Sequence, residues 1–407
     1  MKPLPNGWTE QRVGNLINGL ETGVSVNGED DYSDLNNPAV LKVSAVSYGF
    51  FNPYAAKGIK GDELSRAKTT PKAGQIIISR SNTETLVGAS VFVESDYPNL
   101  YLPDKLWQTI PKINTNMKWL SYVLASDYIR YVLSKLGTGT SGSMKNITQD
   151  EFLGVKALVP PLPEQTKIAQ ILTTWDNAIR TTEQLIANSE QQKQALMQQL
   201  LTGKKRLLND NGERFGKEWE EKEISSLLSE SRITHNVTND AGKRLTVKLN
   251  LNGIEHREQR GTEAENVTAH FVRRAGQFIY GKQNFHKGAF GIIPNKFDLF
   301  ETSQDIPTFD FQESVHAVWF YYFCSQKWFY TGLENQMTGT GSKRLNPKDF
   351  FKISISVPSL KEQQKIAAVL TAADNEIETL KQTLCRLKTE KQALMQQLLM
   401  GRLRVSF

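Results

Sequence analysis

The sequence is poor in several features that would point to particular classes of protein. It holds two cysteines in 407 residues, too few for a disulfide framework. It has no uninterrupted apolar stretch of about 18 residues, so we expect no membrane-spanning helix. Its first residues, MKPLPNGWTE, lack the apolar core of a signal peptide. Together these absences favour a cytoplasmic protein.

No segment carries a strong excess of charge of one sign. The net charge is +6, from 49 basic and 43 acidic side chains, and both signs are spread along the chain. This pattern excludes a polycationic tail as a nucleic-acid-binding element. Any contact with DNA would therefore have to come from local basic patches.

Motifs of known catalytic chemistry are missing as well. The segment NPYAA at 52–56 resembles a methyltransferase loop but lacks its second proline, and TGTGSK at 338–343 lacks the spacing of a phosphate-binding loop. All five histidines follow residue 230, without the spacing of a metal site. Cys324 and Cys385 are expected to be small core residues. We predict no catalytic residue and no metal site.

What the sequence does contain is an internal repeat. The nine residues KQALMQQLL occur twice, 198 positions apart. Between Glu164–Arg206 and Glu362–Arg404, 23 of 43 aligned positions are identical. Weaker matches extend toward the start of each copy, as in AGQIIISRSN (73–82) and AGQFIYGKQN (275–284). The chain is thus two tandem copies of a unit of roughly 200 residues, which is the distance between the repeated segments.

Each copy ends in a segment that predicts a long helix. Apolar residues recur with a 3.5-residue period, which is typical of a coiled-coil seam, and prolines and glycines bound each segment. The seam positions are Ile168, Leu172, Trp175, Ile179, Thr182, Ile186, Ser189, Lys193, Leu196 and Leu200, and Ile366, Leu370, Ala373, Ile377, Leu380, Leu384, Leu387, Lys391, Leu394 and Leu398. The predicted division is a first body (1–160), a central helix (161–203), a second body (204–357) and a C-terminal helix (358–407).

Each body is predicted to be mixed α/β. Short β-rich runs at 75–79 and 89–94 lie among turn residues, and an aromatic-rich helix is expected at 119–136 and at 319–337, with its rings in the core. Because each body precedes its own helix, the two helices must be antiparallel if they pack together. The predicted fold is therefore two α/β (α+β) bodies separated by two long antiparallel coiled-coil helices, a pseudo-two-fold dumbbell.

The repeated motifs resemble a known family. The pattern GQ(I/F)I..(R/K).N, then (V/L)P.L.EQ.KIA..L, then QALMQQLL, is similar to the specificity subunit of type I restriction–modification systems. This resemblance implies a non-catalytic subunit with two target-recognition domains, each reading half of a split sequence in double-stranded DNA, and helices that set the spacer. It also implies two methyltransferase subunits as partners, with restriction–motor subunits joined through the complex. The subunit would need no cofactor, while the complex would use S-adenosylmethionine, ATP and Mg.

Polar segments in each body are candidates for DNA contact. Arginine and lysine can pair with guanine, and asparagine with adenine, in the major groove; the residues predicted for base reading are Arg80, Asn82, Lys282 and Asn284. Glycine-rich turns can bring backbone N–H groups and cations to phosphates; the residues predicted there are Lys145, Asn146, Lys343 and Arg344. Further candidate cations are Arg66, Lys68, Arg273, Arg274 and Lys287.

The near-identical helices suggest a surface for a partner. Gln198, Gln199, Gln396 and Gln397 lie outside the seam, and we predict that they contact two identical methyltransferase subunits. Slow drift after a recent duplication would explain the same identity. Two other interpretations stay open, namely a coiled-coil scaffold whose bodies bind proteins without DNA, and a nuclease or methyltransferase with an unrecognised site.

Overall fold

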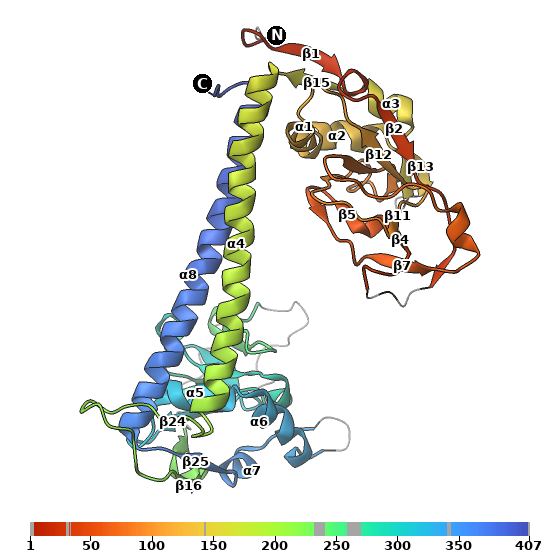
Figure 1. Ribbon diagram of the computed structural model, residues 1–407. Coiled ribbons are helices and arrows are strands. Elements are labelled where there is room, and N and C mark those ends of the chain that lie inside the picture. Colours follow the sequence, from red (N-terminus) through yellow and green to blue (C-terminus); the bar gives the residue numbers. More distant parts are fainter. Residues whose placement is uncertain are drawn as a thin grey trace. The chain divides into compact units, whose positions relative to one another are not determined.

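A computed structural model of the chain describes residues 4–29, 32, 34–141, 144–231, 241–258, 270–339 and 343–405 (Figure 1). The chain forms two compact units, the first made of Met1–Glu183 and Thr383–Phe407 and the second of Gln184–Gln382. Each unit therefore combines one body with a part of both long helices.

The first body is built on a four-stranded antiparallel sheet in the order β10-β8-β12-β2. Its strands are β10 (Ser90–Phe92), β8 (Ile76–Ser79), β12 (Leu106–Ile110) and β2 (Gly19–Thr22). A second sheet contains β11 (Leu100–Tyr101), β4 (Ala39–Leu41), β7 (Ala56–Ile59) and β3 (Gly28–Glu29), and smaller pairings involve β5 (Val46–Ser47) with β6 (Phe50–Phe51), β13 (Thr138–Ser141) with β14 (Met144–Asn146) and β9 (Ser81–Asn82), and β1 (Thr9–Arg12) with β15 (Lys156–Val159). The helices are α1 (Met117–Ala125), α2 (Asp127–Leu136) and α3 (Gln149–Gly154).

The second body repeats this plan. Its four-stranded sheet has the order β17-β24-β21-β22, with β17 (Leu228–Glu230), β24 (Thr308–Phe311), β21 (Phe278–Tyr280) and β22 (Phe290–Ile292). The other pairs are β18 (Leu245–Val247) with β19 (Ile254–His256), β20 (His270–Val272) with β23 (Glu301–Ser303), and β16 (Glu220–Glu223) with β25 (Ser354–Val357). The helices are α5 (Ala317–Cys324), α6 (Lys327–Gly332) and α7 (Pro347–Phe351). The AGQ motif leads into a central strand, β8 or β21, in both bodies.

Both β-rich runs of the first body form strands as predicted, but the single aromatic helix expected in each body is wrong. Two short helices stand in its place, α1 and α2 in the first body and α5 and α6 in the second. Ser126 ends α1 because its backbone is extended (φ −67°, ψ 149°), and its hydroxyl caps α2 by accepting from the N–H of Ile129. Most rings are buried, whereas Tyr128, Tyr131 and Trp328 are exposed.

The core of each unit extends from the body into the long helices. In the first unit, Trp119 and Leu120 of α1 share one hydrophobic cluster with Ile168 and Leu172 of α4 (Leu162–Leu200). In the second unit the corresponding cluster joins α5 to α4 and α8 (Leu360–Leu399). Each body is thus held on the helices by buried apolar surface, the dominant favourable contribution to folding.

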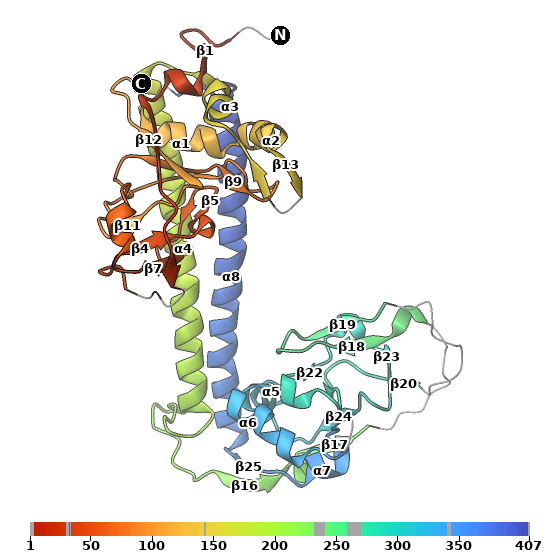
Figure 2. The ribbon, with the colours of Figure 1, turned by 90° about the vertical axis from the view of Figure 1, so that its right-hand side faces the viewer.

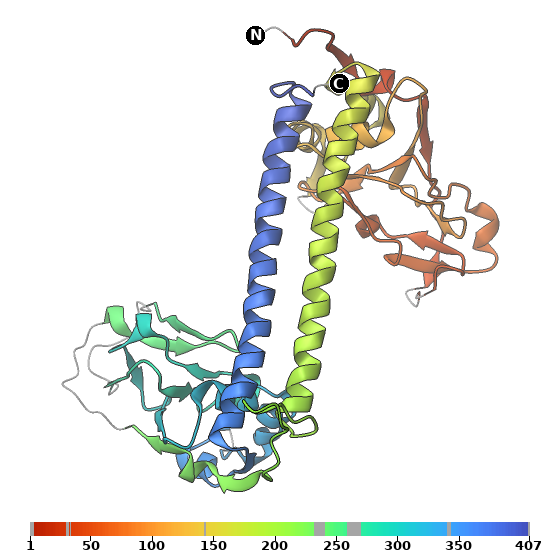
Figure 3. The ribbon, with the colours of Figure 1, turned by 60° about the vertical axis from the view of Figure 1, so that its left-hand side comes forward.

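The helices α4 and α8 have 39 and 40 residues, and each is therefore about 58 Å long or slightly more. All the predicted seam positions are buried or half-buried. Within each unit the helices run side by side in opposite directions (Figure 3). In the first unit, for example, Asp176 pairs with Lys391 while Glu183, further along α4, pairs with Lys388.

Two exposed ion pairs beside the seam differ between the repeats. In the first unit Glu183 of α4 pairs with Lys388 of α8 at 2.7 Å, and in the second Glu190 of α4 pairs with Lys381 of α8 at 2.7 Å. Both acidic members lie on α4 and both lysines on α8. Two copies of the same helix, packed with this register, would bring like charges together, which disfavours that pairing. The ion pairs thus favour α4 with α8.

The seam lysines have carboxylate partners that the sequence did not reveal. Lys391 Nζ lies 2.5 Å from Asp176 Oδ1, and Tyr122 of α1 donates to the other carboxylate oxygen at 2.5 Å. The second unit repeats this arrangement with Lys193, Asp374 and Tyr322. In both units the ammonium group also lies 5.4 Å from the centre of the tyrosine ring. Each of these Tyr–Asp–Lys triads links a body to both long helices.

The EQ dipeptide of the repeated motif (V/L)P.L.EQ.KIA..L lies at the start of each long helix, where its glutamate has a structural role. Glu164 is 1% exposed; its carboxylate accepts from the indole N–H of Trp8 and pairs with Arg404 at 2.7 Å. Glu362 accepts from Trp219 and pairs with Arg206 in the same way. A buried carboxylate needs such partners, because leaving it uncompensated would cost several kcal/mol.

Candidate nucleic-acid interface

The structure brings together the two predicted DNA-contacting segments of the first body. The strand β9 follows β8 and lies close to β13 (Figure 2). It pairs with β14, so that Lys145 lies opposite Asn82. The backbone N–H of Ile147 donates to the carbonyl oxygen of Arg80 at 3.0 Å. Asn146, in the same strand as Lys145, is half-buried. Asn82, Lys145 and Asn146 therefore lie on one small sheet at the end of β8, and Arg80 directly precedes this sheet.

The second body joins its two predicted segments through the same backbone contact. The N–H of Leu345, which corresponds to Ile147, donates to the carbonyl oxygen of Lys282 at 2.9 Å. Lys343 and Arg344, just before Leu345, are exposed. Asn284 is half-buried and precedes the one-turn helix Phe285–Lys287. The structure thus brings these two segments together in each body, and their contact with DNA stays a prediction.

An aspartate orients one arginine in each candidate interface. Arg80 donates through Nε to the carbonyl oxygen of Asp104 at 2.7 Å, and its guanidinium lies 3.6 Å from the Asp104 carboxylate. Arg344 lies 3.6 Å from the carboxylate of Asp305. The arginine side chains are 34% and 45% exposed, respectively. Each guanidinium keeps accessible surface for an acceptor, and the aspartate limits its rotamers before any ligand binds.

Asn82 has a local role that its sequence context does not reveal. Its side-chain oxygen accepts from the N–H of Thr83 at 2.8 Å, and its amide donates to the hydroxyl of Ser79 at 3.3 Å. Lys145 Nζ donates to the carbonyl oxygen of Gly139 at 3.1 Å. These contacts hold the turn in shape, and a base would have to compete with them for the Asn82 amide.

Arg273 is the one candidate cation whose placement contradicts a role in phosphate contact. It is 3% exposed, and its guanidinium donates to Thr302 Oγ1, Thr308 Oγ1 and the carbonyl oxygens of Ser231 and Ile306. Burial lowers its pKa to about 10. The residue holds the second body together from inside. The other candidate cations, Arg66, Lys68, Arg274 and Lys287, are exposed.

A cleft beside the first candidate interface contains polar residues that the sequence analysis missed. It has a volume of about 400 Å³, and Arg80 and Asn146 lie on its wall together with Thr22, Thr138 and Gln149. The Gln149 amide donates to the Thr22 hydroxyl at 3.2 Å across 127 positions of sequence. Amides and hydroxyls of this kind can bind base edges or phosphates. No pattern in the sequence could have joined β2 to α3.

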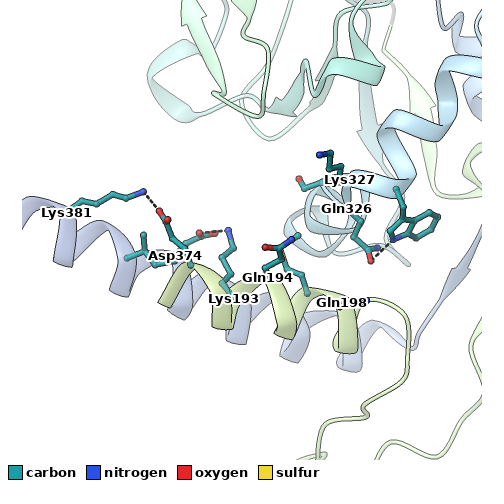
Figure 4. Close-up of a pocket in the computed structure, with 12 residues that line it drawn as sticks. Lys193, Gln194, Gln198, Gln326, Lys327, Asp374 and Lys381 are labelled. Carbon is teal, nitrogen blue, oxygen red and sulfur yellow. Dashed lines mark hydrogen bonds and ion pairs between the residues drawn. The ribbon is translucent and has the colours of Figure 1, made fainter. Parts of the chain in front are cut away.

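The four predicted partner-binding glutamines are all exposed on the long helices. In the second unit Gln198 lies in a cavity of about 560 Å³ between the helices and the α5–α6 turn (Figure 4). Lys193 and Gln194 of α4, Lys381 of α8, and Trp328 also line it, and the Trp328 side chain is 59% exposed. An exposed tryptophan beside free amides is typical of a protein-binding surface.

The corresponding place in the first unit carries different side chains. Gln392, the equivalent of Gln194, donates to the carboxylate of Asp127 at 3.1 Å and so links α8 to the start of α2. Tyr128 stands where the second unit has Trp328, and it is 55% exposed. The glutamines thus occur at equivalent positions in the two units, whereas the side chains of the body beside them differ.

The prediction that both cysteines are core residues is wrong for Cys385. Cys324 is buried, but Cys385 is exposed on α8. It lies next to the seam residue Leu384 on the outer side of the helix, where no packing requires an apolar side chain. Within the described residues, we find no cluster of three or more histidine, cysteine, aspartate or glutamate side chains that could hold a metal ion. No helix in that same part of the chain is long and apolar enough to cross a membrane.

Comparison with known proteins decides the family. The model of the type I restriction modification DNA specificity domain matches the chain twice, at residues 5–191 and 216–389. The chain belongs to this family. It therefore groups with the specificity subunits of these systems and not with their catalytic subunits.

Individual specificity subunits are distant relatives. The EcoEI specificity subunit of Escherichia coli is 25% identical over 203 residues, which are 49% of this chain and 34% of that protein. A putative MjaX specificity subunit of Methanocaldococcus jannaschii is 21% identical over 99% of this chain and 95% of its own length. The crystal structure of a specificity subunit from M. genitalium has a TM-score of 0.60 and 13% identity, over 98% of both chains. This last likeness shows a common fold.

Proposed function

We propose that this specificity subunit recognises a bipartite target in double-stranded DNA, with one half-site bound by each body. The observation that carries the proposal is the repeated interface. In both bodies, the segment after the AGQ strand is joined to the glycine-rich turn by the same backbone hydrogen bond, Ile147 to Arg80 and Leu345 to Lys282. The scaffold is therefore shared, whereas its exposed side chains differ, as two half-sites of different sequence would require.

The long helices would set the distance between the half-sites. Each is a continuous helix that has residues in both units. The Tyr–Asp–Lys triads and the buried Glu164 and Glu362 support a fixed position of each body on its helices. These contacts support the proposal that the target contains a spacer of defined length.

The partners in this proposal are two methyltransferase subunits and, through them, restriction–motor subunits. The subunit itself would be non-catalytic and would need no cofactor. S-adenosylmethionine, ATP and Mg would be used by the other subunits. The exposed glutamines on the two helices support a shared docking surface. If Gln198, Gln199, Gln396 and Gln397 are replaced by alanine, we expect methyltransferase subunits to co-purify less well; unchanged assembly would count against this role.

Methylation mapping tests the DNA target. Genomic DNA is sequenced from cells that carry the methyltransferase encoded with this chain, with and without the chain itself. We expect a split motif with a fixed gap that is methylated only when the chain is present. Exchange of residues 1–150 for those of a relative should then change one half of the motif alone. If no methylated motif depends on the chain, the proposal is refuted and a protein-binding scaffold becomes the better interpretation.

A further inference from the structure

The first body presents the aromatic side chain of Phe50 to solvent, directly after the two-residue turn of a β-hairpin. In the hairpin of β5 and β6, Val46 pairs with Phe51 and Ser47 pairs with Phe50. Val46 and Phe51 pack in the core, so the alternation of a strand places Phe50 on the outer face. The Phe50 side chain is 63% exposed. A strand residue on the solvent side is ordinarily polar, and nothing in the packing of the body requires a phenyl ring here.

The tip of this hairpin is held firmly. Gly49 has a φ of 75°, which the tight turn requires, and its N–H donates to the carbonyl oxygen of Ser90 at 3.0 Å. The Tyr48 hydroxyl donates to the carbonyl oxygen of Val87 at 3.2 Å. The guanidinium of Arg130 lies 4.0 Å from the centre of the Tyr48 ring. A ring on such a support can be pressed against a ligand with little further loss of conformational entropy.

The hairpin lies close to the candidate nucleic-acid interface. Ser90, which holds the tip, is in β10 opposite Ile78 of β8, two residues before Arg80. Neighbouring strands are about 4.8 Å apart, so the tip lies roughly 10 Å from the end of β8. A single DNA-binding module buries roughly 600–1,000 Å² of protein surface, which is wide enough to include both elements. One bound duplex could thus reach both the hairpin tip and the cations at the end of β8.

The position of the second body that aligns with Phe50 carries no exposed ring. The two copies align Gly49 with Gly253, and Phe50 with Ile254. Ile254 is only partly exposed and packs against Gly291 of β22. The exposed ring is therefore particular to the first body and is not a part of the shared scaffold. Such a difference fits a residue that acts on one half-site.

We propose that Phe50 is an apolar wedge that enters the stack of base pairs in the half-site bound by the first body. Apolar side chains inserted at a base step unstack it partly and bend the duplex. The proposal rests on the proposed function, since it assumes that this body binds DNA. We infer DNA as the ligand because basic side chains lie near the hairpin: Arg130 stacks on the adjacent Tyr48, and Arg80 and Lys145 lie at the end of β8, which favours an anionic partner.

The test uses the full-length chain and a duplex with the methylated motif. Three variants are compared, Phe50→Ala, Phe50→Trp and Ile113→Ala. Ile113 is 94% exposed and follows β12, which is antiparallel to β8, so it lies beyond the opposite end of the sheet from Arg80. It therefore controls for the loss of an exposed apolar side chain. The thermal midpoint of each variant shows whether folding is intact.

We expect Phe50→Ala to weaken binding about tenfold, the lower part of the range for loss of a stacked aromatic contact. Phe50→Trp should bind about as tightly as the wild-type chain, and Ile113→Ala should not change the affinity. With 2-aminopurine placed at each step of the first half-site, the wild-type chain should raise the fluorescence at one step, and Phe50→Ala should not.

Two results would overturn the wedge. One is a Phe50→Ala variant that equals Ile113→Ala in affinity and in 2-aminopurine signal. The other is unchanged DNA binding together with loss of the methyltransferase subunits, which would make Phe50 a protein contact. Neither result affects the methylated motif that supports the proposed function. If no motif depends on the chain, the proposed function fails first, and the wedge with it.

Discussion

The Tyr–Asp–Lys triads offer a quantitative test of how the bodies are held on the helices. Replacement of Lys391 by methionine keeps the length of the side chain but leaves the Asp176 carboxylate without its ammonium partner. The two side chains are 22% and 31% exposed, and their atoms are 2.5 Å apart. Exposed ion pairs contribute about 0.2–1 kcal/mol, and loss of one partner of a buried pair costs about 3–5 kcal/mol. For this intermediate burial we expect a loss of about 2 kcal/mol.

A double-mutant cycle isolates the interaction itself. The variants Lys391→Met, Asp176→Asn and their combination are unfolded in urea, and circular dichroism is fitted with one transition for each unit, because two compact units need not unfold together. The interaction energy from the cycle should be about 1–2 kcal/mol, since neighbouring charged groups are not additive.

The chain supplies its own control for this cycle. Asp374 is the same residue in the second unit, where it pairs with Lys193 at 2.5 Å. Lys391→Met combined with Asp374→Asn breaks one pair in each unit, so the two effects should add within about 0.5 kcal/mol. The reasoning is refuted if the matched and mismatched cycles give the same interaction energy.

Three further predictions concern buried polar groups and the thiols. Arg404→Met should lower the free energy of unfolding of the first unit by about 3 kcal/mol, because the buried Glu164 carboxylate loses its guanidinium partner; a change under about 1 kcal/mol by urea unfolding would contradict this. Arg273→Lys should destabilise the second body by about 2–4 kcal/mol, since one ammonium cannot replace four hydrogen bonds to buried oxygens; equal stability in thermal and urea unfolding would be the contrary result. Burial raises the pKa of the Cys324 thiol well above its usual value, while Cys385 is exposed. A thiol reagent at pH 8 should therefore modify one cysteine of the folded chain at once and both after unfolding, and fast reaction of both in the folded chain would show the burial to be wrong.

The sequence was informative about features that depend on local pattern. The period of the seam predicted both long helices, and the repeat predicted two bodies of the same mixed α/β class. The pairing of the Arg80 segment with the Lys145 segment came only from the structure. The aromatic helices were predicted less well, since a single cap at Ser126 was enough to break one of them.

Residue roles that depend on distant partners could not be predicted. Lys193 and Lys391 looked like unfavourable seam residues, and only the folded chain places Asp374 and Asp176 beside them. Arg273 has the sequence context of a surface cation, yet hydrogen-bond acceptors from four other positions hold it in the interior.

The sequence by itself determined the duplication, the two long helices and the family, because each depends on residue spacing within one segment. Only the tertiary structure decided which charges are buried and which are free to meet a ligand, because burial is set by elements far apart in the chain. The exposure of Phe50 is of this second kind: the strand pairing that turns Val46 and Phe51 inward is what turns Phe50 toward solvent.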